Sequence, residues 1–321
     1  MNQLKLITIV QSVLIAGLVL TAVILLLFRN HEKEETVPVS LEVEETKSYD
    51  YTPEADAVYE TTGEKIFLRD AEAGEIWIPV LADVPACEYK ADQYVTRNGL
   101  MYYTENGKVI SRFGIDVSAH QREIDWATVK KAGVEFAMIR VGYRGYTEGI
   151  LAMDDCFERN MQGAQDAGID IGVYFYSQAV TPEEAIEEAE FVLSAIADKE
   201  ITYPVVYDWE VVTNDTARTD DVSVRTLTQC SIAFCERIRQ AGYMPMIYQN
   251  KRTSLLKLDL PELTDYDFWL AEYNDEATYY YNYQMWQYAS DGTVPGVEGH
   301  VDVNICFKDY TNPESESDEN A

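Results

Sequence analysis

The segment that decides the fold is Pro204-Val-Val-Tyr-Asp-Trp-Glu210, an apolar run that ends in two carboxylates. Its Val-Val-Tyr core predicts a buried β-strand. Residues two apart on a strand share a face, so Asp208 and Glu210 point the same way, with their Cα atoms roughly 6.6 Å apart along the strand. The strand therefore brings a pair of acids to one of its ends.

A repeated helix end marks the units on either side of this strand. Lys131-Ala-Gly133, Asp166-Ala-Gly168 and Gln240-Ala-Gly242 each close a helical stretch and precede an apolar strand, and Gly is common just after a helix end. The intervals between these glycines are 35 and 74 residues, so the second interval holds two units. Its missing strand is 204–210, and Thr181-Pro-Glu-Glu184 predicts the start of the helix before it. Such alternation predicts a parallel α/β barrel or a doubly wound sheet.

The pattern changes beyond residue 250. Three strand-like runs, 267–273, 280–289 and 301–307, follow one another without a helix between them. Eight strands and about five helices then fit into residues 113–308, which is 196 residues, whereas an ordinary (β/α)₈ barrel needs about 250. We therefore predict an α/β fold, an irregular TIM-like barrel with about five βα units followed by three strands.

The N-terminal residues 1–29 predict a transmembrane anchor. The 23 residues from Leu6 to Phe28 carry no charge, and a helix of that length, roughly 35 Å, spans a hydrocarbon core of about 30 Å. The alternative is a cleaved signal peptide, whose apolar region usually runs only about 7–15 residues. Residues 30–62 predict an acidic linker, and residues 309–321, with five acids and no base, predict an acidic disordered tail.

Residues 63–112 read as strands and predict a small β module before the barrel. Leu100-Met-Tyr-Tyr-Thr104 and Lys108-Val-Ile-Ser-Arg112 flank Asn106-Gly107, a dipeptide typical of two-residue β-hairpin turns. The residues of this module do not indicate its function.

The composition excludes several classes of protein. There are 56 acidic and 25 basic residues, a net charge of −31, which excludes a nucleic-acid partner held by clustered Lys and Arg. The three histidines lie far apart and no His-x-x-His or Cys-x-x-Cys pair occurs, so we expect no metal site and no cofactor. The five cysteines are odd in number and irregularly spaced, which does not suggest a disulfide framework.

Carboxylates gather where such a barrel places its active site, at the C-terminal ends of the strands. Asp116 follows the first strand, Asp208 and Glu210 follow the fourth, and Asp302 lies beside the last. Clustered carboxylates cannot all ionise cheaply, so at least one keeps its proton near neutral pH. A protonated acid beside an ionised one is what cleavage of a glycosidic bond requires. By itself Asp-x-Glu is a weak signal, because a solvated strand end explains most random instances.

Five motifs follow one another along residues 113–308: Phe113-Gly-Ile-Asp-Val-Ser-Ala-His-Gln121, Asp208-Trp-Glu210, Trp269-Leu-Ala-Glu-Tyr273, Met285-Trp-Gln-Tyr288 and Val301-Asp-Val-Asn304. In order and context they resemble the glycoside hydrolase family 25 lysozymes, the Chalaropsis-type muramidases. The resemblance implies an irregular α/β barrel with five βα units and three further strands. It also implies hydrolysis of the β-1,4 bond between N-acetylmuramic acid and N-acetylglucosamine in peptidoglycan.

The same resemblance assigns roles to the four acids. Glu210 would be the general acid, and Asp208 would stabilise developing positive charge or position the substrate's acetamido group as an internal nucleophile. Asp116 and Asp302 would complete the acidic floor and raise the proton affinity of Glu210. Whether the reaction passes through a covalent enzyme intermediate or the acetamido group stays open. Glu272 departs from the family, in which a neutral polar residue is expected, and would add charge near the cleft.

Five aromatic residues on the strands, at or near their C-terminal ends, are candidates for substrate binding, because their rings offer an apolar face and a polar edge to sugars: Tyr174, Tyr176, Tyr248, Trp286 and Tyr288. Ordinary core packing is the alternative for each of them, and the resemblance favours Tyr176 and Trp286. Arg140, at the end of the second strand, is a further candidate. It would hold Asp116 or Asp208, or form a plain structural ion pair.

The sequence therefore predicts a peptidoglycan hydrolase, a lysozyme or N-acetylmuramidase, whose partners are peptidoglycan glycan strands and the cell membrane. We expect a single-pass protein with its catalytic domain on the extracellular, cell-wall side, because the charges flanking the span are nearly balanced and the substrate lies outside. One alternative is a non-catalytic barrel that binds cell-wall glycan. Another is an acetamido-assisted, chitinase-like glycosidase, which usually carries another Asp where this chain has Val206. A polysaccharide deacetylase is disfavoured because metal-ligand histidines are lacking.

Overall fold

The computed structural model describes residues 48–50, 59–70, 74–97 and 99–311, which belong to one structural unit. The predicted anchor and most of the predicted linker lie outside these ranges. Among the residues that are described, no helix combines the length and the apolar character needed to cross a membrane.

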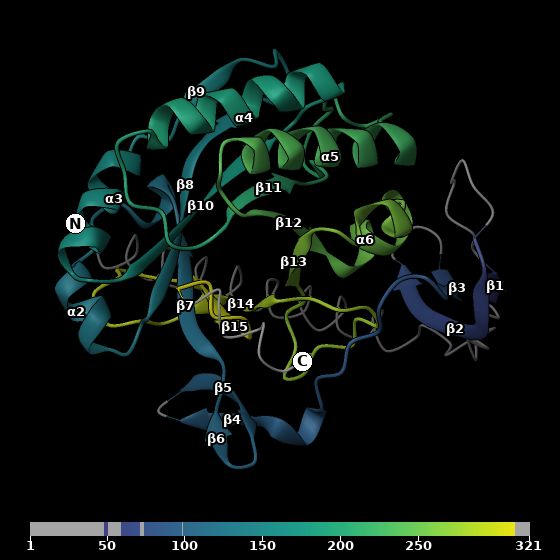
Figure 1. Ribbon diagram of the computed structural model, residues 1–321, viewed down its shortest axis with the longest axis horizontal. Coiled ribbons are helices and arrows are strands. Elements are labelled where there is room, and N and C mark those ends of the chain that lie inside the picture. The colour runs from purple at the N-terminus through teal and green to yellow at the C-terminus, as the bar shows by residue number, and fades with distance from the viewer. Residues whose placement is uncertain (1–47, 51–58, 71–73, 98, 312–321) are drawn as a thin grey trace, which may run out of the picture. The chain divides into compact units, whose positions relative to one another are not determined.

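Eight strands of the described chain close into a barrel: β7 (Arg112–Val117), β8 (Phe136–Arg144), β10 (Asp170–Ser177), β11 (Val205–Trp209), β12 (Pro245–Asn250), β13 (Asp267–Ala271), β14 (Met285–Gly292) and β15 (Val301–Cys306). Neighbours from β7 through β14 run parallel, whereas β15 runs antiparallel to both β14 and β7 and closes the ring (Figure 1). The short β9 (Leu151–Met153) extends the sheet beyond β8. The predicted irregular barrel is confirmed.

Five α-helices lie outside the barrel in the described ranges: α2 (Trp126–Lys131), α3 (Phe157–Asp166), α4 (Pro182–Ile196), α5 (Val224–Gln240) and α6 (Lys251–Lys257) (Figure 1). The predicted glycine stops follow α2, α3 and α5, where Gly133, Gly168 and Gly242 have φ values of 102°, 67° and 89°. At the start of α4, Pro182 is the first helical residue and the Thr181 hydroxyl accepts a hydrogen bond from the Glu184 amide. Residues 267–306 contain three strands and no α-helix, as predicted.

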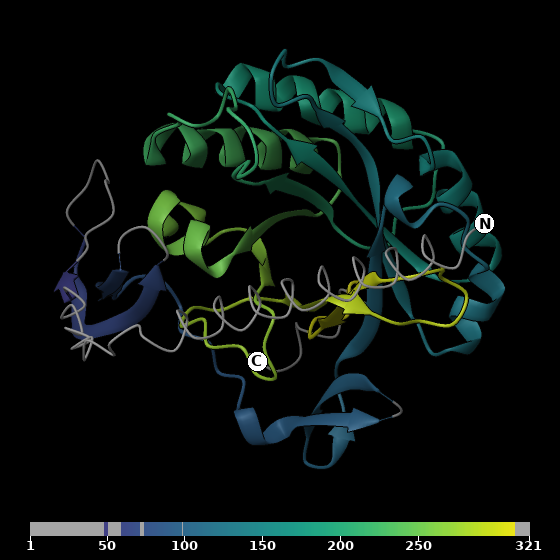
Figure 2. The same cartoon turned by 180° about the vertical axis from the view of Figure 1, so that it is seen from behind.

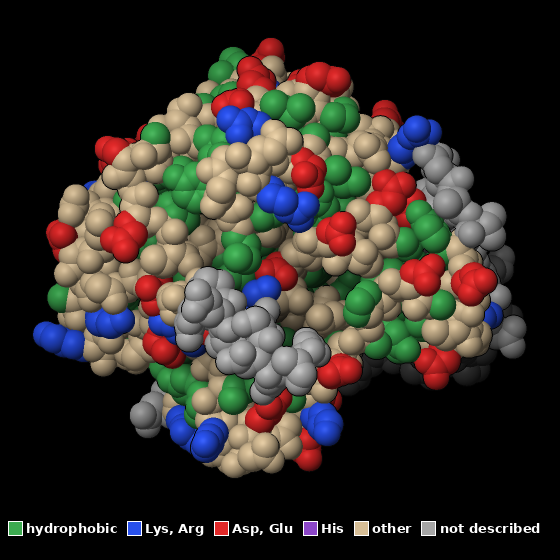
Figure 3. All heavy atoms as spheres, viewed as in Figure 1, with side chains coloured by type: hydrophobic (Ala, Val, Ile, Leu, Met, Phe, Trp, Pro, Cys, Tyr) green, Lys and Arg blue, Asp and Glu red, His purple; other side chains and the backbone are tan. Residues whose placement is uncertain are grey.

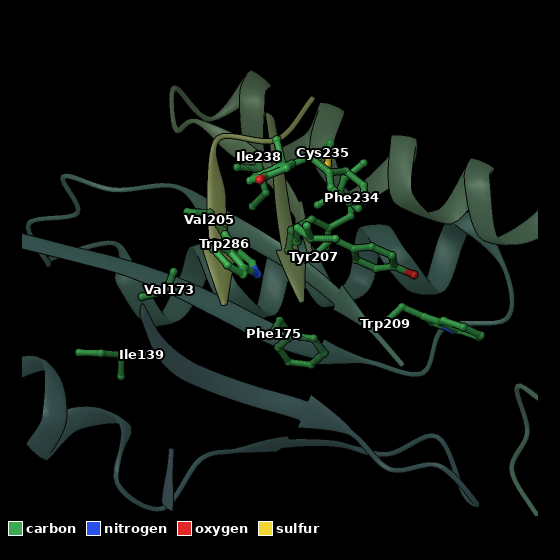
Figure 4. Packing of buried hydrophobic residues seen from close by; sticks show 14 of the residues in the cluster. Ile139, Val173, Phe175, Val205, Tyr207, Trp209, Phe234, Cys235, Ile238 and Trp286 are labelled. Carbon is green, nitrogen blue, oxygen red and sulfur yellow. The ribbon is translucent and has the colours of Figure 1, made fainter. Parts of the chain in front are cut away.

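Alternate residues of each strand enter two different cores. Outward residues such as Val205 and Tyr207 pack against Phe234 and Ile238 of α5, as Figure 4 shows. Inward residues fill the barrel itself, and they include Phe136, Met138, Tyr174, Val206, Met246 and Trp269. Because β11 alternates in this way, Asp208 faces the inside of the barrel while Trp209 faces out.

The predicted β module consists of two separate sheets. The first contains β1 (Ser48–Asp50), β2 (Thr61–Asp70) and β3 (Gly74–Leu81), and the second contains β4 (Tyr94–Arg97), β5 (Leu100–Glu105) and β6 (Lys108–Val109). The predicted hairpin joins β5 to β6, and its turn residues Asn106 and Gly107 have φ values of 49° and 77°. Since β1 and the start of β2 fall within residues 30–62, the prediction of a plain linker is wrong there.

The sheet of β4–β6 lies against the part of the barrel that lacks helices, and the sheet of β1–β3 lies beside α6, where Asp70 pairs with Arg252 (Figures 1 and 2). The Leu81 amide of β3 donates to the Tyr281 hydroxyl at 3.0 Å, and the Tyr89 ring, in the segment leading to β4, stacks on Phe307 with centroids 3.9 Å apart. In the run Tyr279–Tyr283 the odd-numbered tyrosines are buried against these contacts. This run is therefore half-buried rather than an exposed aromatic rim.

The chain continues to pack beyond residue 308. Arg112 pairs with Asp309 at 3.6 Å, and the buried Tyr310 donates from its hydroxyl to Asp267 at 2.9 Å. The prediction of a disordered tail is thus wrong for residues 309–311, because Tyr310 closes the lower end of the barrel core. Residues 312–321 lie outside the described ranges.

Candidate active site

A cleft of about 620 Å³ opens at the C-terminal ends of the parallel strands, and all four predicted acids line it. Asp116 stands on β7, Asp208 and Glu210 lie at the end of β11, and Asp302 lies on β15. Asp302 is near the beginning of its strand. It reaches the cleft because β15 is antiparallel to β7, which places Asp302 opposite Asp116 in the register.

Asp208 and Glu210 form a coupled pair of carboxyl groups that share a hydrogen bond. Burial raises the pKa of Asp208 well above its usual range, and the charges of Glu210 and Asp116 raise it further, while Arg140 opposes the shift. Burial also raises the pKa of Glu210, the hydrogen bond with Asp208 lowers it, and the charge of Asp302 raises it further. Two acids in this environment do not ionise together, so the pair holds a proton at neutral pH.

Asp116 has a different set of partners. Its Oδ2 accepts one hydrogen bond from Gln287 Nε2 and one from Asn304 Nδ2, each at 2.8 Å. Burial raises the pKa of Asp116 to about 6, although these two amide donors lower it. Burial, followed by the charge of Asp116, raises the pKa of Asp302 to about 8. The two amide donors therefore favour the negatively charged form of Asp116.

The two amides beside Asp116 are themselves held in place. The Tyr248 and Tyr273 hydroxyls both donate to Gln287 Oε1 at 2.9 Å. Trp269 Nε1 donates to Asn304 Oδ1 at 2.9 Å. Because each amide oxygen is occupied, each amide nitrogen is directed at the carboxylate.

The family motifs contain Gln287, Asn304, Trp269 and Tyr273, but no role in the site was predicted for these residues. A usable signal was present in two of them. Gln287 and Asn304 are polar residues inside apolar strands, and both are buried, at 3% and 0% exposure. A buried amide on a strand needs a partner, and here that partner is Asp116.

Two further glutamines fix the backbone of the acid pair. Gln178 Nε2 donates to the Glu210 carbonyl at 2.9 Å, and Gln249 Nε2 donates to the Trp209 carbonyl at 2.7 Å. Both side chains are completely buried. The end of β11, which no longer has ladder partners of its own beyond Trp209, is thus held from both neighbouring strands.

Tyrosines form much of the cleft wall. Tyr174, Tyr176 and Tyr248 line it as predicted, and the half-exposed Tyr143 and Tyr146 from the end of β8 and its following loop join them. These last two were missed because their segment carries no strand-end motif. A wall of aromatic rings around carboxylates suits a sugar substrate.

The structure contradicts the prediction that Trp286 contacts substrate. Trp286 is fully buried in the outer core, where its Nε1 donates to the Glu272 carbonyl at 2.8 Å, and the next residue, Gln287, occupies the inward face. Tyr288 also lies outside the cleft, where its hydroxyl accepts from the Met101 amide at 3.4 Å. Strand alternation explains both outcomes, because only one face of β14 points into the barrel.

Two charged residues are engaged away from the reacting groups. Arg140 borders the cleft but pairs with the buried Asp154 at 2.7 Å, so it is the structural ion pair of the two predicted options. Glu272 turns into its own loop, where it accepts from the Thr278 amide at 2.7 Å and pairs with Lys251 at 3.3 Å. Glu272 therefore does not line the cleft, and Lys251 balances the charge that was expected near it. His120 is an exposed neighbour of the site.

The described ranges show no candidate metal site. Within them, no group of three His, Cys, Asp or Glu side chains is arranged to hold a metal ion. On the face shown in Figure 3, acidic and basic side chains are interspersed and no basic patch gathers.

The strand ends of this α/β barrel present a pair of carboxyl groups that hold a proton beside a third carboxyl group that can ionise. This is the architecture of a glycoside hydrolase. The sequence profile described as Glycosyl hydrolases family 25 matches residues 115–297, more than half of the 321 residues. The chain belongs to this family.

Several known proteins are similar to this chain. The autolytic lysozyme of Clostridium acetobutylicum is 28% identical over 193 residues, which cover 60% of this chain and 54% of that protein. The uncharacterized protein YegX of Escherichia coli is 27% identical over 203 residues, covering 60% of this chain and 68% of YegX. This chain therefore spans about half the length of the clostridial relative.

Solved structures share the fold. The modular autolysin LytC of Streptococcus pneumoniae aligns with a TM-score of 0.54 at 24% identity, over 79% of this chain and 62% of that chain. The spore cortex lytic enzyme SleM of Clostridium perfringens aligns with a TM-score of 0.55 at 20% identity, over 63% of this chain and 68% of that one.

Proposed function

We propose that this protein is a peptidoglycan hydrolase, a Chalaropsis-type muramidase that cleaves the β-1,4 bond between N-acetylmuramic acid and N-acetylglucosamine. The observation that carries the proposal is the buried, coupled pair Asp208–Glu210 beside Asp116 in the cleft of a family 25 barrel. The names of its relatives support the substrate class, because they include an autolytic lysozyme and an autolysin whose structure was solved with a synthetic peptidoglycan ligand.

Exposure separates the roles of the paired acids. Glu210 is only partly buried, whereas Asp208 is 4% exposed, so Glu210 is the group that reaches the oxygen of a bound glycosidic bond. Glu210 gives its proton to that oxygen as the bond to the sugar C1 breaks. The positive charge that develops at C1 is stabilised by ionised carboxylate in the cleft, and two amide donors favour the charged form of Asp116.

The reaction is completed by water. The hydroxyl of the water joins C1, directly or after a carboxylate or the substrate's acetamido oxygen has held C1 for a time, and its proton returns to Glu210. If the acetamido oxygen holds C1, Asp208 orients the acetamido group. The atoms and charges balance on each of the three routes.

Analysis of digestion products tests this function. Purified peptidoglycan treated with the protein is expected to release fragments with muramic acid at the reducing end, as read by mass spectrometry. Reducing-end glucosamine would overturn the muramidase assignment in favour of a glucosaminidase. Binding to the wall without any release of sugar would identify a non-catalytic glycan-binding barrel.

We also propose that residues 1–29 anchor the protein in the cell membrane and that the catalytic barrel faces the cell wall. The support is the uncharged run of 23 residues from Leu6 to Phe28, which matches the thickness of a bilayer as a helix. Protease added to intact, wall-stripped cells should remove the barrel. A barrel that resists protease until the cells are lysed would contradict this orientation.

A further inference from the structure

A second cavity of about 620 Å³ lies next to the catalytic cleft, and Tyr273 lines both. The Tyr273 hydroxyl belongs to the hydrogen-bond network of Asp116, while the residue as a whole is 53% exposed. The two cavities therefore share one accessible aromatic side chain.

Two parts of the chain build this cavity. The barrel contributes Asn274 and Asp275 after β13 and Tyr288 to Asp291 of β14, and the hairpin of β4 and β5 contributes Thr96, Gly99 and Met101. These hairpin residues precede the family match, which begins at residue 115. The cavity is thus an addition to the family barrel by the small sheet.

The small sheet is firmly seated, so the cavity has a defined shape. The Met101 amide donates to the Tyr288 hydroxyl at 3.4 Å, directly at the cavity wall. Below it, the Tyr94 hydroxyl lies 3.2 Å from the Tyr283 hydroxyl, and the Tyr94 ring meets Trp286 edge-on with centroids 5.4 Å apart. Backbone and aromatic contacts together fix the hairpin on β14.

The lining selects against an anionic ligand. It contains the carboxylates of Asp275 and Asp291, both exposed, and neither forms an ion pair within the described chain; no Lys or Arg lines the cavity. Carboxylates and carbonyl groups accept hydrogen bonds from hydroxyls, and the rings of Tyr273 and Tyr288 supply apolar surface. A neutral ligand rich in hydroxyl groups fits this combination.

We infer that this cavity is an accessory subsite for further sugar units of the glycan strand whose scissile bond lies in the catalytic cleft. The inference rests on the proposed function, because a glycan strand bound in the cleft would meet the second cavity at Tyr273, which lines both. The small sheet then serves to lengthen the glycan-binding groove, and the enzyme prefers long strands to short ones.

Cleavage of glycan strands of defined length tests the subsite. Strands stripped of their stem peptides, with the exposed lactyl carboxylates converted to neutral methylamides, are fractionated by size. They are digested by the full chain, by Asp275→Ala/Asp291→Ala and by Asp83→Ala. Asp83 is an exposed acid after β3 that lines neither cavity and is the matched control. The double variant should lower the ratio of kcat/KM for long strands to that for short ones by about two- to tenfold, the worth of one or two hydrogen bonds.

The outcomes separate the subsite from the activity itself. A wild-type enzyme that cleaves no strand of any length refutes the proposed function. Cleavage with the same length preference in all three proteins refutes the subsite alone. A change that is seen only with strands carrying stem peptides would show that the cavity holds the peptide and would overturn its assignment to sugar. Unchanged thermal unfolding of the double variant confirms that its effect is local.

Discussion

Asp116 and Asp208 are buried aspartates on the inward faces of two barrel strands, yet their surroundings differ. Asp116 accepts two amide hydrogen bonds at 2.8 Å, and its pKa rises only to about 6. Asp208 Oδ1 has no hydrogen-bond partner in the described chain, and the pKa of Asp208 rises well above its usual range. Burial alone does not decide which acid carries charge; the neutral donors aimed at it do.

This contrast divides the cleft into two halves. In one half, the Asp208–Glu210 pair holds a proton. In the other half, Asp116 accepts hydrogen bonds from Gln287 and Asn304, which favour its negative charge. Acid-catalysed cleavage of a sugar linkage needs both, so each half can be tested by removing what distinguishes it.

The largest effect is expected from Glu210→Gln, which keeps the shape of the proton-holding half but removes its transferable proton. The rate on purified peptidoglycan should fall about 10²–10⁴-fold, the usual contribution of a general acid. Turbidity of a wall suspension measures it. A Gln variant that clears the wall at the normal rate would eliminate Glu210 as the acid.

Asn304→Leu removes one of the two hydrogen bonds donated to Asp116. It should lower kcat about tenfold or more, because a hydrogen bond to a charged group is lost. Loss of this donor raises the pKa of Asp116 above about 6, so the acid limb of the pH–rate profile should move to higher pH. Trp269→Phe, which removes only the donor behind Asn304, should shift the limb less. An unmoved limb in the Leu variant would show that Asp116 does not need its charge.

Asp302→Asn tests the energetic consequence of burying an acid. The pKa of Asp302 is about 8 in the folded protein, against about 3.9 in an unfolded chain. Its contribution to stability is therefore complete below pH 4 and is lost as the pH rises through 8. Denaturant unfolding should show a fall in the free energy of unfolding between pH 5 and pH 9 that is smaller in the Asn variant. An identical fall in both proteins would contradict this.

The smallest effect is expected from Gln249→Met, which removes one donor from the Trp209 carbonyl. We expect kcat to fall about two- to tenfold with little change in KM, since one neutral hydrogen bond positions the acid pair. Gln229→Met, at an exposed glutamine of α5, is the control. A loss that appears in KM alone would assign Gln249 to substrate binding instead.

The fold was largely predictable because short stretches of sequence mark the ends of its helices and the positions of its strands. Helix stops at Gly133, Gly168 and Gly242 and apolar strands between them give the alternation directly. Strand direction is not local, because an isolated run such as 301–307 reads the same in either direction. The antiparallel course of β15, which brings Asp302 to Asp116, therefore did not follow from the periodicity.

The four acids of the site could be predicted from the sequence. The residues that form hydrogen bonds with them could not. Alternation on β14 shows that Trp286 and Gln287 lie on opposite faces, but it does not show which face is inside. Gln287 lies on the inward face because Asp116 and two tyrosines form hydrogen bonds with its amide, while Trp286 fills the outer core. Such choices depend on contacts between strands that are far apart in the sequence.

The antiparallel closing strand also matters to anyone who produces the catalytic part alone. A fragment limited to the family match, 115–297, leaves out β15 and so presents two unpaired strand edges, those of β14 and β7. Open edges of this kind recruit strands from other molecules. A fragment trimmed to the barrel at 113–308 keeps the ring closed but strips both small sheets from Phe307 and Tyr281. Soluble material is therefore expected only when the strands from β1 onward and residues through Tyr310 are retained.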